Sequence, residues 1–95
     1  MSEEITSLRV RIDGTVQGVG FRAFALRQAV ALELTGWVRN RRDGTLEALV
    51  AGPTKRVESF IGACMKGPPG ARVQNIDLET DALPSGRAFV ELPTA

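Results

Sequence analysis

The sequence predicts an α+β domain in which an antiparallel sheet is covered on one face by two helices. Two observations support this fold class. Segments in which apolar and polar residues alternate, as in half-buried strands, are interleaved with two segments of helical character. Their order is strand, helix, strand, strand, helix and strand, followed by a short extra strand at the C-terminus. A chain of 95 residues fits one domain over residues 1–95.

The first part of the chain predicts a strand, a loop and a helix. Leu8, Val10 and Ile12 alternate with polar residues, which is typical of a strand with one buried face. Residues 14–20 contain three glycines and predict a loop. Residues 21–34 are rich in Ala, Leu and Arg and contain neither Gly nor Pro, so they predict the first helix by propensity.

A hairpin is expected next. Residues 36–41 and 45–51 have strand character, and the Asp43-Gly44 dipeptide between them is a strong signal for a tight turn. The Gly52-Pro53 pair is expected to end the second of these strands. The hairpin requires the two strands to be antiparallel neighbours in the sheet.

The last part of the chain completes the pattern. Thr54 is expected to cap a second helix, whose apolar residues have helical spacing: Val57, Phe60, Ile61 and Cys64. The run Gly67-Pro68-Pro69-Gly70 stops this helix, and residues 73–79 and 87–92 predict two strands separated by a turn. The complete order is the split βαβ, ferredoxin-like pattern.

The composition excludes several kinds of chemistry. The chain has no histidine, so neither a histidine base, a phosphohistidine intermediate nor a histidine metal ligand is available. A single cysteine and acidic, polar residues 1–6 without a signal sequence predict a cytoplasmic protein. The formal net charge of +1 indicates no bulk attraction to nucleic acid or membranes. We expect a monomer without a metal or cofactor, with residues 1–6 flexible.

The loop before the first helix has the features of an anion site. Its backbone N–H groups can point into one concavity, and the start of a helix adds free N–H groups and the positive end of a dipole. Arg22, in the first helical turn, can bind two phosphate oxygens with its guanidinium. These groups would come from residues 14–22, which join the first strand to the first helix. The alternatives are that the glycines only form a turn and Arg22 is a solvated surface residue.

Asn40 is the second candidate functional residue. Asparagine is disfavoured within strands, and its carboxamide can both donate and accept hydrogen bonds, so it can hold a water molecule in a fixed orientation. The alternative is simple turn chemistry, because asparagine is common near hairpins.

These segments resemble the two signatures of the acylphosphatase family. The first is Val16-Gln17-Gly18-Val19-Gly20-Phe21-Arg22 and the second is Gly36-Trp37-Val38-Arg39-Asn40-x-x-Asp43-Gly44. The later segment Gly67-Pro68-x-x-Ala71-x-Val73 is also similar to the family. The resemblance extends over residues 8–92. One departure is Glu33, which stands where many members have glycine.

The resemblance implies an enzyme that hydrolyses the carboxyl–phosphate bond of small acyl phosphates without a metal. It implies that Arg22 and Asn40 are catalytic and that the backbone of residues 17–21 is the phosphate cradle. Such a mixed anhydride has a good leaving group, so positioning and charge stabilisation do most of the work. Acetyl phosphate, carbamoyl phosphate and 1,3-bisphosphoglycerate have the same phosphate end, so the acyl group is left open.

Other residues and functions were also weighed. Cys64 is expected to be a buried apolar side chain, Trp37 a packing residue that could border the pocket, and Arg39, Arg41 and Arg42 a solvated cluster that could attract anions. Three alternative functions are a ferredoxin-like module that binds RNA or protein, the carbamoyl-phosphate-handling domain of hydrogenase maturation proteins, and an inactive family member. The lack of an aromatic platform on residues 46–51 disfavours RNA binding, and the chain end at Ala95 favours a free-standing hydrolase.

Overall fold

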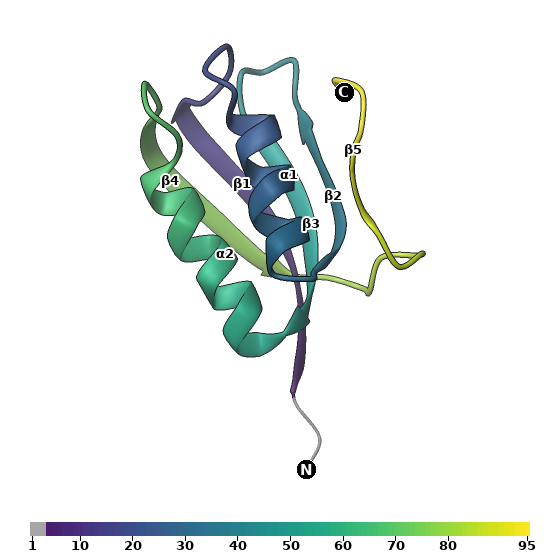
Figure 1. Ribbon diagram of the computed structural model, residues 1–95. Helices are drawn as coiled ribbons and strands as arrows, with labels where there is room; N and C mark the ends of the chain where they lie inside the picture. The colour runs from purple at the N-terminus through teal and green to yellow at the C-terminus, as the bar shows by residue number, and fades with distance from the viewer. Residues whose placement is uncertain (1–3) are drawn as a thin grey trace.

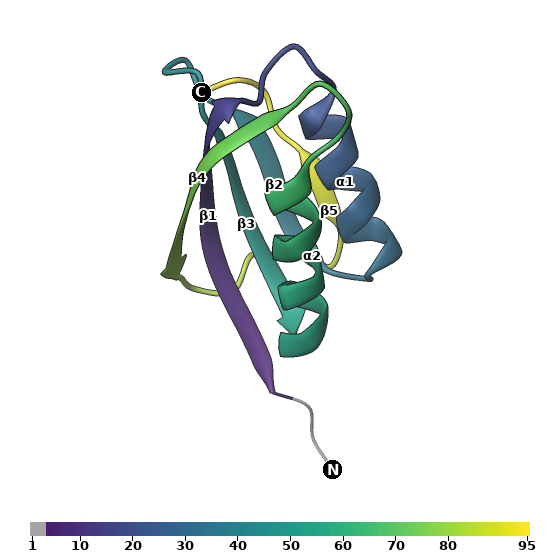
Figure 2. The same cartoon turned by 90° about the vertical axis from the view of Figure 1, so that its left-hand side faces the viewer.

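The computed structural model describes residues 4–95 and has one five-stranded sheet with two helices on one face (Figures 1 and 2). The strand order is β4-β1-β3-β2-β5. The predicted ferredoxin-like α+β fold is therefore confirmed. The elements are β1 (Ile5–Thr15), α1 (Phe21–Ala31), β2 (Thr35–Asn40), β3 (Leu46–Pro53), α2 (Thr54–Lys66), β4 (Arg72–Thr80) and β5 (Phe89–Glu91).

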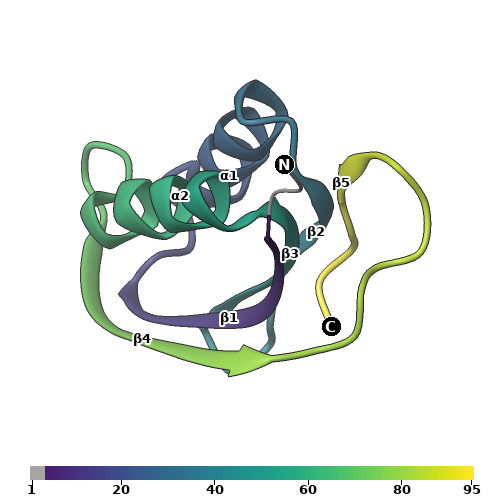
Figure 3. The same ribbon diagram turned by 90° about the horizontal axis from the view of Figure 1, so that it is seen from below.

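The short last strand departs from the expected antiparallel arrangement. The pairs β1–β3, β1–β4 and β2–β3 are antiparallel, whereas β5 pairs with β2 in parallel. The segment after β4 runs to the opposite edge of the sheet before β5 begins (Figure 3). It therefore enters β5 in the direction of β2, and the sheet is mixed. The strand spans Phe89–Glu91, shorter than the expected residues 87–92.

Helix α1 ends earlier than its composition suggested, at Ala31 instead of Leu34. The N–H of Glu33 donates to the carbonyl of Val30 at 3.0 Å, and that of Leu34 donates to Ala29 at 2.9 Å. These two bonds form a Schellman motif, which requires a left-handed residue after the helix. Glu33 occupies that position with φ 57°. The departure from glycine at Glu33 thus falls where glycine is conformationally favoured.

The junction between β3 and α2 also differs from expectation. β3 continues through Pro53, and Thr54 is the first helical residue, not its cap. The hydroxyl of Thr54 is 2.6 Å from that of Thr6, so it joins the helix to β1 rather than satisfying a helical N–H. The chain N-terminal to Glu4 lies outside the described residues, while Ile5 and Thr6 belong to β1.

The core lies between the sheet and the two helices. Phe21, Ala25 and Ala29 form the buried face of α1, and the two small residues let the helix approach the sheet closely. Val57, Phe60 and Cys64 are the buried residues of α2. The sheet contributes Val10, Ile12, Val38, Leu46, Ala48, Val50 and Phe89. The helix in residues 54–66 therefore has the predicted apolar face.

This fold gathers three segments at one end of the sheet. The β1–α1 loop, the β2–β3 hairpin and the C-terminal residues lie together there, at the top of Figure 1. The hairpin has the predicted turn, because the N–H of Gly44 donates to the carbonyl of Arg41 at 3.1 Å. Both candidate functional segments are therefore at the same end of the molecule.

Candidate active site

The β1–α1 loop is anchored at both ends by buried residues, and between them two glycines adopt left-handed backbone conformations. Val16 and Phe21, which flank it, are each 1% exposed. Gly18 and Gly20 both have φ 75°, in the left-handed region that glycine adopts without penalty. A Cβ atom at either position would meet nothing within 4 Å. Glycine is thus required here by backbone conformation, and not by lack of space.

The loop and the first turn of α1 present free amides. Within residues 4–95, the N–H groups of residues 17–23 donate to no backbone carbonyl and no side chain, and the first bond of the helix is Phe24 N–H to the Gly20 carbonyl at 3.0 Å. Gly20 supplies no capping side chain, and the first turn has no acidic residue. Unpaired amides at a helix N-terminus favour an anion.

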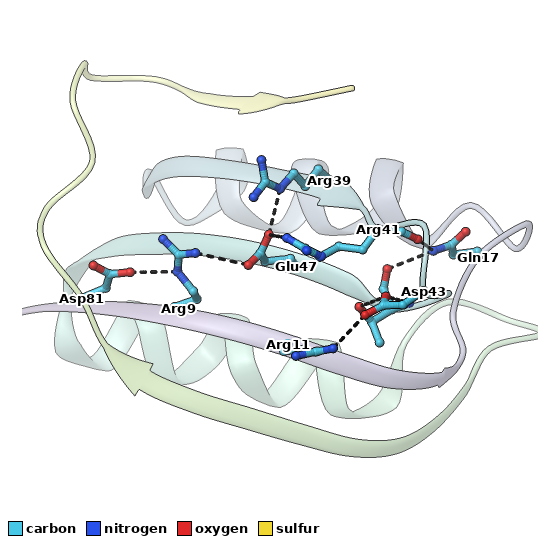
Figure 4. Close-up of polar contacts among 9 residues, drawn as sticks. Arg9, Arg11, Gln17, Arg39, Arg41, Asp43, Glu47 and Asp81 are labelled. Carbon is cyan, nitrogen blue, oxygen red and sulfur yellow. Dashed lines mark hydrogen bonds and ion pairs between the residues drawn. The ribbon is translucent and has the colours of Figure 1, made fainter. Parts of the chain in front are cut away.

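The side chain of Gln17 holds the loop against the hairpin. Its Nε2 donates to the carbonyl of Arg41 at 2.7 Å and to that of Thr45 at 2.9 Å (Figure 4). The family resemblance implied a backbone role for Gln17. The side-chain role depends on a contact between segments 24 and 28 residues apart, which no local pattern shows.

Asn40 is the last residue of β2, beside the loop. Its Oδ1 is buried and has no hydrogen-bond partner among the described residues. Its backbone carbonyl accepts a hydrogen bond from the N–H of Ala95 at 3.0 Å, and the N–H of Arg42 donates to the carbonyl of Ala95 at 2.7 Å. The backbone is therefore held while the side-chain oxygen is left free. Because a buried unpaired acceptor is costly, a bound donor such as water is expected there.

A cavity of about 340 Å³ brings these groups together. Residues 16–18 and 20–23, Asn40 and Glu91 line it. Arg22 and Asn40, which are 18 positions apart in the sequence, thus share one pocket. Of the expected cradle residues only Val19 is absent from the lining, because its side chain packs against the core.

Glu91 is a pocket residue that sequence analysis missed. Its Oε2 lies 3.5 Å from Nε of Arg22, and both side chains are 35% exposed. A signal for it existed, because Glu91 follows the buried Phe89 by two residues and so lies on the same, core-facing side of β5.

Trp37 and the neighbouring arginines lie outside the pocket, on the face of the sheet that the helices do not cover. The guanidiniums of Arg39 and Arg9 lie 4.6 and 5.6 Å from the centre of the Trp37 ring. Trp37 therefore does not border the cavity.

The expected solvated cluster is largely paired on that face. Nε of Arg39 and Nη1 of Arg41 bind Oε1 of Glu47 at 2.8 and 3.1 Å, and Nη1 of Arg9 binds its Oε2 at 3.2 Å (Figure 4). Burial alone would raise the pKa of Glu47, but the hydrogen bonds from Arg39 and Arg41 outweigh it and leave the pKa lowered. Arg39 and Arg41 thus stabilise the sheet.

Cys64 is buried in α2, as expected. Burial raises the pKa of its thiol to about 12, so the nucleophilic thiolate does not form near neutral pH. The described residues hold no group of three or more His, Cys, Asp or Glu side chains placed to bind a metal ion. Neither helix between residues 4 and 95 is long and apolar enough to span a membrane.

The fold and the pocket define a ferredoxin-like domain with a cavity lined by a glycine loop, an arginine and a carboxamide. Comparison with known proteins agrees. The acylphosphatase family model matches residues 8–90. An acylphosphatase from Rhizorhabdus wittichii is 48% identical over 86 residues, which cover 90% of this chain and 87% of the relative.

Solved structures give the same result. The crystal structure of acylphosphatase from Bacillus subtilis superposes with a TM-score of 0.87 and 37% identity, covering 94% of this chain and 99% of that one. Full-length HypF in a phosphate- and nucleotide-bound form gives a TM-score of 0.89 at 28% identity, over 99% of this chain but 13% of HypF. This chain belongs to the acylphosphatase family, and it is a hydrolase that cleaves acyl phosphates to a carboxylate and inorganic phosphate.

Proposed function

We propose that hydrolysis takes place in the pocket between the β1–α1 loop and the end of β2. The backbone amides of residues 17–21 and the guanidinium of Arg22 bind the phosphoryl oxygens of the substrate. The carboxamide of Asn40 orients the attacking water. No metal ion or cofactor takes part.

The observation that carries this proposal is the convergence on one cavity of two unsatisfied sets of groups, the loop amides and the Asn40 Oδ1, together with the guanidinium of Arg22. The loop amides have no acceptor within residues 4–95. Oδ1 of Asn40 is buried without a donor among those residues, and Arg22 lines the same cavity. A phosphoryl group supplies acceptors for the amides and for Arg22, and a water molecule supplies a donor for Asn40 Oδ1.

The reaction requires little further machinery. The water oxygen forms a bond to phosphorus while the bond from phosphorus to the acyl oxygen breaks, and the acyl group leaves as a carboxylate. One water proton hydrogen-bonds to the Asn40 Oδ1 during the attack, and the transferred proton goes to an oxygen of the substrate's own phosphoryl group. The preorganised amides and Arg22 stabilise the charge on the three equatorial oxygens.

The test is the hydrolysis of benzoyl phosphate in the presence of a chelator. Arg22→Ala should lower kcat by about 10²–10³-fold, because a charged donor to the transition state is lost, and should weaken competitive inhibition by inorganic phosphate. Asn40→Ala should lower kcat by about 10²-fold through loss of water positioning, with phosphate inhibition nearly unchanged. Activity that disappears with chelator would contradict the metal-free reaction.

Each variant has a matched control. Arg27 is an exposed arginine on the same helix as Arg22, and Asn75 is an exposed asparagine on β4. Arg27→Ala and Asn75→Ala should keep parental kinetics. Normal activity of Arg22→Ala would refute its role, and a collapse of phosphate affinity in Asn40→Ala would make Asn40 a binding residue instead of a water-orienting one.

The proposal also includes the domain organisation, oligomeric state, location and binding partners of the protein. We infer a single-domain, cytoplasmic monomer that binds small acyl phosphates and no nucleic acid. Cys64 is free and buried, in agreement with a reducing compartment. Arg39 and Arg9 flank the Trp37 ring, which leaves a poor stacking platform for bases. Sedimentation and filter binding with single-stranded RNA test these points.

A further inference from the structure

Two charged side chains line the cavity among the described residues, Arg22 and Glu91. The parallel register pairs Glu91 with Val38, a core residue, and Phe89 with Gly36. Phe89 and Glu91 therefore point to the helix side of the sheet, where Phe89 is buried and the next residue on that side, Glu91, is an exposed carboxylate. A negative charge at the rim of an anion pocket opposes phosphate binding, so it needs a physical account.

The contact with Arg22 leaves the phosphate-binding edge of the guanidinium free. Glu91 faces Nε of Arg22 at 3.5 Å, while the two terminal nitrogens remain available for a forked contact with phosphate oxygens. Arg22 can thus hold the phosphoryl group and the Glu91 carboxylate together. The carboxylate then lies close to whatever is attached to the phosphoryl group.

We propose that Glu91 selects substrates by the charge of the acyl group, so that the enzyme prefers acyl phosphates with a neutral or cationic acyl part over those with an anionic one. This inference rests on the proposed function of the pocket. With a bound phosphate dianion, the positive charge of Arg22 is already more than neutralised. A negative charge on the acyl group is then repelled by both Glu91 and the phosphate, and no positive charge compensates it. An ammonium group or N–H donor on the acyl group can instead bind the Glu91 carboxylate.

The size of the effect follows from Coulomb's law. Two like charges about 7 Å apart, at an effective dielectric between about 40 and 80, repel enough to change a rate constant by roughly three- to eight-fold. High salt screens partly exposed charges, so the preference should shrink as ionic strength rises.

The experiment compares three substrates that share one reacting centre: benzoyl phosphate, 4-carboxybenzoyl phosphate and 4-(aminomethyl)benzoyl phosphate. Substituents also change intrinsic reactivity, so the readout is the ratio of kcat/KM values in the parent divided by the same ratio in Glu91→Gln. For benzoyl relative to 4-carboxybenzoyl phosphate, we expect a double ratio of about three to eight. For benzoyl relative to 4-(aminomethyl)benzoyl phosphate, we expect a double ratio below one. The control is Glu58→Gln, which changes the net charge by the same amount but lies on α2 in a separate groove. When Glu58→Gln replaces Glu91→Gln in the calculation, the double ratio should be one.

The outcomes separate this inference from the proposed function. If parent protein fails to hydrolyse benzoyl phosphate, the proposed function fails. If it hydrolyses all three substrates and Glu91→Gln leaves their ratios unchanged, charge selection by Glu91 is refuted. Glu91→Asp should keep the preference, and high salt should reduce it in the parent protein, which tests the charge without relying on the folding of Glu91→Gln. A preference that is indifferent to salt would also overturn the inference.

Discussion

Replacing Glu33 with glycine should raise the free energy of unfolding by about 0.5 kcal/mol, because a side chain no longer has to adopt the left-handed backbone conformation at the end of α1. Glu33 has φ 57° and forms the Schellman bond to Val30. A side chain in this conformation costs about 1–2 kcal/mol. Glycine also has an unfavourable effect of about 0.4–1 kcal/mol, because it increases the conformational entropy of the unfolded chain.

The side chain of Glu33 contributes little that would be lost. Its Oε1 lies 3.8 Å from Nη1 of Arg56, and the two side chains are 78% and 44% exposed. An exposed ion pair with this geometry contributes about 0–0.5 kcal/mol. At their midpoints these terms leave a gain of about 0.5 kcal/mol, which corresponds to a rise in Tm of roughly 2–4 °C for a domain of this size.

Thermal and urea unfolding of the two proteins measure this difference, with Glu33→Ala as the control. Alanine removes the carboxylate but keeps a Cβ atom in the left-handed conformation, so it should give no gain. Equal stabilisation by alanine and glycine would show that charge, and not backbone strain, sets the cost at this position. A loss of stability in Glu33→Gly would refute the strain argument.

Three further predictions concern the two faces of the sheet and the core. Glu47→Gln should lower the free energy of unfolding by about 1–2 kcal/mol near neutral pH. The pKa of Glu47 is lowered in the folded state, so ionised Glu47 stabilises the fold at pH values above its ordinary pKa of 4.5. This stabilisation is lost as the pH falls through the pKa of Glu47 in the folded state. The unfolding curves of parent and variant should therefore converge in acid. Gln17→Ala should weaken phosphate inhibition by about three- to ten-fold and lower stability by about 1 kcal/mol, since two hydrogen bonds to the hairpin are lost; unchanged inhibition would mean that the loop holds its shape without them. Cys64 should react with a thiol reagent only at the rate of unfolding, because its thiol is buried with a pKa of about 12; fast labelling of the folded protein would contradict its burial.

Local signals were sufficient for most of the fold. The alternation over residues 8–12, the glycine loop, the Asp43-Gly44 turn and the apolar spacing in residues 54–66 all correspond to observed elements. Each of these depends on neighbours within a few positions, and steric preferences and side-chain periodicity act at that range. The same patterns singled out Arg22 and Asn40, which share one cavity.

Element ends were less predictable where a tertiary contact overrides propensity. The helix-favouring residues Leu32 to Leu34 lie beyond α1, because the chain must turn back to enter β2. Thr54 resembles a cap in the sequence, but its hydroxyl pairs with Thr6. The orientation of β5 depends on which edge of the sheet the preceding segment reaches, and no pattern within that segment encodes it.

Short-range chemistry is enough to predict the fold class, the glycine loop proposed to bind an anion, and the two polar residues proposed to act on the substrate. Only the tertiary structure decided that Glu91 contacts Arg22, that the Gln17 side chain joins the loop to the hairpin, and that Arg39 and Arg41 are neutralised by Glu47. These contacts join different elements of the fold. Side chains distant in the sequence meet only when strands pair and helices pack, so their interactions depend on the whole fold.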